Sequence, residues 1–121
     1  MFSEKEGWYV STLRNTEICC NKIIETHNTF KTVVDFYADW CGPCRMMAPK
    51  IEEFSKVFPE VKFIKVNTDE QTELSREYSI SSLPTFYIFV NGKRDESLDV
   101  IGAREGMLRE NIQKALDKIK Q

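Results

Sequence analysis

The sequence has little of what marks several large classes of protein. Its 121 residues hold 17 Lys and Arg against 19 Asp and Glu, so it lacks the basic excess that nucleic-acid or anionic-membrane binding requires. No apolar run approaches the length of a membrane span, and no apolar segment follows a basic start within the first ten residues. These absences predict a cytoplasmic protein with no nucleic-acid or membrane partner.

Cysteine and histidine are also scarce. The four cysteines form an adjacent pair, Cys19 and Cys20, and a two-spaced pair, Cys41 and Cys44. Structural disulfides of a secreted domain suit this arrangement poorly, whereas a two-spaced pair in an intracellular chain is typically catalytic. A zinc site built from both pairs is disfavoured because a strand separates them, so we expect no metal. The single histidine, His27, is predicted near a helix end at the surface.

The adjacent cysteines lie in a predicted helix, and their neighbours decide their roles. Cys20 shares the apolar stripe of that helix with Ile23 and Ile24 and is expected in the core. Cys19 is expected at the surface. We predict a monomer, and a disulfide through Cys19 that joins two chains is the alternative.

What the chain does contain is the pattern of an ordinary globular domain. Hydrophobic residues make up 41% of it and charged residues 30%, with no repeat, linker or low-complexity segment. We predict a single domain over residues 1–121 with a loose N-terminus at 1–7. Period-two and apolar runs predict strands at 8–13, 32–38, 61–66, 85–90 and 97–101. Helical spacing predicts helices at about 15–28, 43–58, 70–78 and 108–120.

The order of these elements predicts the fold class. The segment 32–38 is apolar on both sides, as expected of a central strand covered on both faces. A strand, a helix and a strand in succession form a right-handed parallel unit. Asn91-Gly92 predicts a hairpin turn, which makes the last pair of strands antiparallel. We predict a three-layer α/β fold in which a mixed sheet of about five strands is flanked by four helices.

The two-spaced cysteines stand in the pentapeptide Trp40-Cys41-Gly42-Pro43-Cys44, directly after the apolar run. A strand that ends there and opens into a helix puts the first sulfur at the positive end of the helix, where a thiolate is stabilised. Pro43 suits a helix start because its missing N–H has no partner there. By itself this motif fits an oxidant, a reductant or half of a metal site.

Further motifs accompany the cysteines along the chain from about Thr32 to the C-terminus. They are Asp35-Phe36, Leu83-Pro84-Thr85-Phe86, Asn91-Gly92 and Ile101-Gly102-Ala103. Together with the pentapeptide they resemble the thioredoxin family. Tyr37 departs from the commonest pattern, since bacterial members often have tryptophan there.

The resemblance implies a thioredoxin fold and a protein-disulfide reductase that acts in cell redox homeostasis through a Cys41–Cys44 redox disulfide. In that mechanism Cys41 attacks the substrate disulfide, and Cys44, shielded beneath it, resolves the mixed disulfide. No cofactor is bound. Electrons come from NADPH through thioredoxin reductase, and disulfide-containing proteins such as peroxiredoxins and ribonucleotide reductase are the expected partners.

Asp35 is the candidate proton acceptor for Cys44. A carboxylate within an apolar strand is costly to bury in its charged form, so its pKa is expected to rise toward neutrality. The resemblance places Lys65 beside this acid. The alternative is that Asp35 and Lys65 form a buried ion pair with no catalytic role.

The resemblance also implies a cis Leu83-Pro84 bond packed against the cysteines, with the backbone of Leu83 free to pair with an extended substrate segment. The alternative is a trans proline at a strand edge. A small, mostly apolar patch should surround Cys41. Its members are Trp40, Gly42, Pro43, Leu83, Pro84, Ile101, Gly102 and Ala103.

Two other functions use the same motif. A disulfide isomerase usually carries a more polar residue before the second cysteine, so Pro43 favours a reductant. An interaction module would need the patch but not the turnover. We therefore predict an electron-carrying reductase.

Overall fold

The structure, a computed structural model, describes residues 10–12 and 31–119. The described strands are β1 (Val10–Thr12), β2 (Lys31–Tyr37), β3 (Val61–Asn67), β4 (Thr85–Val90), β5 (Lys93–Arg94) and β6 (Val100–Ile101). The described helices are α2 (Gly42–Val57), α3 (Thr72–Glu77), α4 (Glu105–Ile119) and the 3-10 helix η2 (Glu96–Leu98).

The sheet is mixed, as predicted. Its order is β1-β3-β2-β4-β5, with β6 also pairing with β4. β1 and β2 run parallel to β3, while β4 runs antiparallel to β2. The central strand β2 pairs Asp35 with Lys65 on one side and with Phe86 on the other. This register puts the candidate acid in the middle of the sheet.

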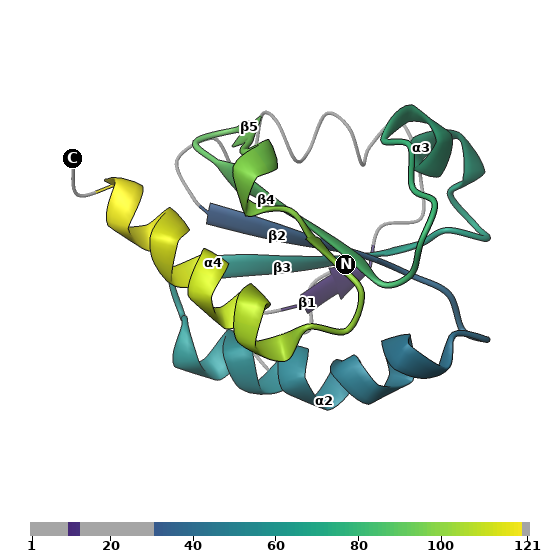
Figure 1. Ribbon diagram of the computed structural model, residues 1–121, viewed down its shortest axis with the longest axis horizontal. Helices are drawn as coiled ribbons and strands as arrows, with labels where there is room; N and C mark the ends of the chain where they lie inside the picture. Colours follow the sequence, from purple (N-terminus) through teal and green to yellow (C-terminus); the bar gives the residue numbers. More distant parts are fainter. Residues whose placement is uncertain (1–9, 13–30, 120–121) are drawn as a thin grey trace.

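Helices cover both faces of the sheet (Figure 1). α2 and α4 lie on one face and α3 lies on the other. Successive residues of β2 enter different cores: Val33 packs with the α2 and α4 side chains, and Val34 packs with Leu74 of α3. Burial of both faces explains why this strand is apolar throughout. The three-layer architecture is therefore confirmed.

Some predicted elements fall on residues outside those described. Three α-helices are described, and the fourth predicted helix, at about 15–28, lies outside the described residues. So do Cys19, Cys20 and His27, and so does half of the strand expected at 8–13, of which the structure describes Val10–Thr12.

The strand predicted at 97–101 is wrong. Asn91 and Gly92 both have positive φ, at 54° and 84°, which gives the predicted hairpin turn, but the returning strand splits into β5 and β6. The Asp95 carboxylate accepts hydrogen bonds from the backbone N–H and the hydroxyl of Ser97, at 3.1 and 2.6 Å. These bonds cap η2 and interrupt the ladder between the two short strands.

Candidate active site

The cysteine motif lies where β2 has ended and α2 begins, as predicted. Cys41 is the N-cap of α2, and its Sγ accepts a hydrogen bond from the backbone N–H of Cys44 at 3.1 Å. The two cysteines form a disulfide with their Cα atoms 5.2 Å apart. The first sulfur therefore sits at the positive end of a sixteen-residue helix, where negative charge is stabilised.

Two cavities lie beside the disulfide, one lined by each cysteine. Cys41 lines a cavity of about 400 Å³ together with Trp40, Gly42, Pro43 and Leu83. Cys44 lines a separate cavity of about 150 Å³, which is described below. Both cysteines are buried, with 4% and 8% of their surface exposed, so exposure alone does not rank one beneath the other. The cavities distinguish them instead.

The predicted patch around Cys41 comes from several segments. The Leu83-Pro84 bond is cis, as expected. The backbone N–H of Gly102 donates to the Pro84 carbonyl at 2.7 Å, and Ile101 pairs with Thr85, so this loop lies beside the cis-proline. Trp40 and Ile101 are large exposed apolar side chains, at 69% and 54% exposure.

Four residues of the patch line the Cys41 cavity and four do not. Those that line it are Trp40, Gly42, Pro43 and Leu83, and those that do not are Pro84, Ile101, Gly102 and Ala103. Pro84 is buried, while Ala103 is exposed just beyond the loop.

A second wall of this cavity was not predicted from the sequence. It is formed by Thr68, Ser75, Ile80 and Ser81. The indole N–H of Trp40 also donates to the Asp69 carboxylate at 3.0 Å. Tyr37 pairs with Asn67 at the carboxyl ends of the parallel strands β2 and β3, so the loops that follow both strands meet at one edge. The meeting of the carboxyl ends of parallel strands at one edge was the signal from which this second wall could have been predicted.

The Cys44 cavity holds the candidate acid. It is lined by Asp35, Tyr37, Ala38, Asp39, Cys44, Arg45, Ala48 and Lys65. Asp35 is buried, and its Oδ1 has no hydrogen-bond partner. Burial raises the pKa of Asp35 to about 7, and the positive charge of Lys65 acts in the opposite direction. The side chain can therefore gain or lose a proton near neutral pH.

Lys65 does not form the buried ion pair that was the alternative. Ion pairs between described residues join Lys50 to Glu105, Arg94 to Asp99, Lys114 to Glu110 and Lys118 to Asp95. The Lys65 ammonium lies instead over the ring of Tyr37, 4.4 Å from its centroid. Asp35 is thus influenced by Lys65 without being neutralised by contact.

The described residues offer neither a metal site nor a membrane-spanning helix. Within residues 10–12 and 31–119, no group of three or more His, Cys, Asp or Glu side chains could hold a metal ion. Of the helices described, none combines the length and the apolar character that a membrane crossing requires.

A disulfide across the first turn of a helix, with a cis-proline loop beside it, is the arrangement of a thiol-disulfide oxidoreductase. The family model described as thioredoxin matches residues 12–115. The chain belongs to the thioredoxin family. Its activity is the reduction of protein disulfides, and its redox centre is the Cys41–Cys44 pair.

Individual relatives agree with this assignment. Over 80 residues the chain is 44% identical to Thioredoxin-1 of Saccharomyces cerevisiae, a match that covers 66% of this chain and 76% of the relative. A match to Thioredoxin-2 of Pyricularia oryzae, 43% identical, covers 64% of this chain but only 44% of that longer protein. The crystal structure of thioredoxin from Trypanosoma brucei brucei superposes with a TM-score of 0.81 at 36% identity and covers 94% of both chains.

Proposed function

We propose that Cys41 is the attacking thiol and Cys44 the resolving thiol of this reductase. The observation that carries the proposal is that the two cysteines line different cavities. Cys41 lies in the larger one, beside exposed Trp40, and Cys44 lies in the smaller one, beside Asp35. A protein substrate therefore meets Cys41 first, while Cys44 has the group that can take its proton.

The reaction consists of two exchanges. The Cys41 thiolate attacks one sulfur of the substrate disulfide, which forms a mixed disulfide and releases the other substrate sulfur as a thiolate. Cys44 then loses its proton and attacks the Cys41 sulfur. The mixed disulfide breaks, the second substrate thiolate leaves, and the Cys41–Cys44 disulfide forms. Two electrons pass to the substrate, and the disulfide described above is the oxidised product.

Asp35 is the proposed acceptor of the Cys44 proton, directly or through a water molecule. Both groups line the same cavity, and a pKa of about 7 matches the acid to proton exchange near neutral pH. Lys65 modulates Asp35 by its charge. A carboxylate with a pKa near 4 would be a weaker base toward a thiol.

The proposed substrate surface combines the Cys41 cavity with the cis-proline loop. Trp40, Gly42, Pro43 and Leu83 offer a mostly apolar wall, and the loop that carries Ile101, Gly102 and Ala103 lies beside Pro84. The backbone of Leu83 next to the cis bond would pair with an extended substrate segment as an added strand. Few side-chain demands imply a broad range of protein substrates.

We further propose a cytoplasmic, monomeric carrier that is reduced by thioredoxin reductase at the expense of NADPH. Peroxiredoxins and ribonucleotide reductase are its proposed targets. The family assignment supports these proposals, since its members act on disulfide-containing substrates.

The test is catalysed reduction of insulin by dithiothreitol. Native protein should accelerate the reaction, and Cys41→Ser should return the rate to the dithiothreitol background because no attacking thiol remains. If the native protein gives no acceleration, the patch serves binding alone and the reductase proposal fails.

The Cys44→Ser variant assigns the two roles. It should accumulate mixed disulfides with insulin through Cys41, because nothing resolves them, and mass spectrometry of the adduct identifies the linked cysteine. The matched Cys41→Ser variant should accumulate few. Trapping mainly through Cys44 would reverse the assignment.

A further inference from the structure

Lys65 stands between two possible partners on strand β2. In the register of β2 and β3, Lys65 pairs with Asp35 and Asn67 pairs with Tyr37. Asp35 and Tyr37 are two residues apart on one strand and so project to the same face of the sheet, with Lys65 beside both. The ammonium of Lys65 lies over the Tyr37 ring at 4.4 Å from the centroid, well within cation–π range.

The ring and the carboxyl group therefore compete for one cation. Asp35 Oδ1 is buried and has no hydrogen-bond partner, so it would accept an ammonium if one approached. The other charged or titratable groups that face this cavity are Asp39 after β2, and Cys44 and Arg45 on α2. The Arg45 guanidinium donates to the Asp39 carbonyl at 2.9 Å. Lys65 is thus the cation that acts on Asp35.

The Tyr37 ring carries a hydroxyl group at its far end. Burial raises the pKa of this hydroxyl, and the side chain of Asn67, a buried residue at the end of β3, acts in the opposite direction. Any aromatic residue at this position would offer a ring face to a cation, whereas only tyrosine carries this hydroxyl. The two contributions can therefore be separated by substitution.

We propose that Tyr37 is a positioning residue: its ring holds the Lys65 ammonium on its face and off the Asp35 carboxyl group. The carboxyl group then feels the charge of Lys65 at a distance and remains free to exchange a proton. The inference rests on the proposed role of Asp35, and it adds the residue that keeps the Asp35 carboxyl group free to exchange a proton. The closing experiment measures the two separately.

The experiment follows the Asp35 carboxyl carbon by NMR in ¹³C-labelled, oxidised protein, in which Cys41 and Cys44 do not titrate. Tyr37→Leu should lower the pKa of Asp35 by about one unit, because the released ammonium moves to the carboxylate and favours its charged form. Tyr37→Phe and Tyr37→Trp keep an aromatic face and should retain the native value.

The Lys65→Met background decides whether Tyr37 acts through Lys65. In that background Tyr37→Leu should leave the pKa of Asp35 unchanged. If Tyr37→Leu raises the pKa or leaves it unchanged in the native background, or lowers it equally with Met at 65, the inference is overturned. An equal fall in the pKa of Asp35 in both backgrounds would mean that the Tyr37 ring acts only by excluding water. Lys65→Met alone should raise the pKa, a measurement that does not depend on the Tyr37 variants folding.

Activity provides the second readout. The pH dependence of insulin reduction by Tyr37→Leu should shift to lower pH with the pKa of Asp35, and Tyr37→Phe should keep the native profile. If the NMR titration shifts as expected and the rate profile does not, Tyr37 positions Lys65 but Asp35 is not the proton acceptor. If neither shifts, the positioning role itself is wrong.

Discussion

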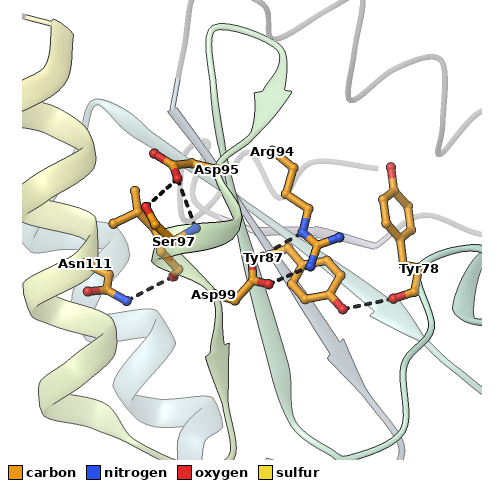
Figure 2. A network of polar contacts seen from close by, with 8 residues as sticks. Tyr78, Tyr87, Arg94, Asp95, Ser97, Asp99 and Asn111 are labelled. Atoms are coloured by element: carbon orange, nitrogen blue, oxygen red, sulfur yellow. Dashed lines mark hydrogen bonds and ion pairs between the residues drawn. The ribbon is translucent and has the colours of Figure 1, made fainter.

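The redox end of the sheet and the β4–β5–α4 corner treat their polar groups in opposite ways. At the redox end Asp35 is buried with an unpartnered Oδ1. At the corner, shown in Figure 2, the Arg94 guanidinium donates to both oxygens of Asp99, at 3.3 and 2.5 Å, and lies over the Tyr87 ring at 3.6 Å. The Tyr87 hydroxyl in turn donates to the Tyr78 carbonyl at 2.9 Å.

The difference shows where this fold leaves a buried polar group without a hydrogen-bond partner. A buried polar group costs free energy unless it is hydrogen-bonded. The corner satisfies its groups and gains stability, and the hydrogen bonds from Lys118 and Ser97 hold the pKa of Asp95 below its usual value. The redox end leaves Asp35 Oδ1 without a partner, and burial raises the pKa of Asp35 to about 7. Stability is lost there, and a titratable group is obtained.

The largest expected effect is that of Asp35→Asn on stability at pH 8. The pKa of Asp35 rises from 3.8 in the unfolded chain to about 7 in the folded protein. An acid whose pKa is raised by folding makes its full contribution to stability below pH 3.8. That contribution is lost as the pH rises to about 7. A shift of about three units corresponds to about 4 kcal/mol. Asn cannot ionise, so at pH 8 the variant should be more stable by up to this amount.

Urea unfolding of both oxidised proteins at pH 4, 6 and 8 checks the effect. The stability difference between variant and native protein should grow steadily with pH in favour of the variant. Asp35→Leu provides a second replacement that cannot ionise. A difference that is the same at pH 4 and pH 8 would show that Asp35 keeps an ordinary pKa.

The contrast between the two regions also explains what the sequence could predict. The strand that carries Asp35 and the helix start at Cys41 depend on local patterns, namely an apolar run and a two-spaced cysteine pair before Pro43. Those patterns suffice to predict the fold class and the buried acid Asp35. The cis bond at Pro84 followed from the family resemblance.

Other features depend on contacts that no local pattern encodes. The break between β5 and β6 arises because Asp95 caps η2, although the run 97–101 by itself favours a strand. The position of the Lys65 ammonium depends on the Tyr37 ring, which belongs to a neighbouring strand. The second wall of the Cys41 cavity comes from the segment between β3 and β4, which the strand order places beside the loop that carries the cysteines.

Asp99→Ala should have the opposite sign to Asp35→Asn. It removes a two-bond partner of Arg94 from a partly buried site, where 24% and 18% of the two side chains are exposed. We expect a loss of about 1 to 2 kcal/mol in the free energy of unfolding at pH 7. Glu110→Ala, which breaks the exposed pair with Lys114, is the matched control and should change stability by less than about 0.5 kcal/mol. Equal losses for the two variants would remove the distinction between a satisfied corner and an ordinary surface pair.

Asp95→Ala is the smallest of the three effects and tests the sign of the pH dependence. The variant loses the cap of η2 and the ion pair with Lys118, which together should cost about 1 kcal/mol at pH 7. Because the folded-state pKa of Asp95 is lowered, its stabilisation is present above the unfolded pKa of 3.8 and is lost as the pH falls through the folded value. The deficit of the variant should therefore shrink below pH 4, whereas the advantage of Asp35→Asn grows above it. Asp95→Asn keeps an oxygen for the Ser97 N–H but loses the charge, so it should retain part of the stability and none of the pH dependence. A stability deficit that stays constant from pH 7 to pH 3 would mean that Asp95 acts through packing. Asp95 and Asp35 would then no longer contribute to stability with opposite dependence on pH.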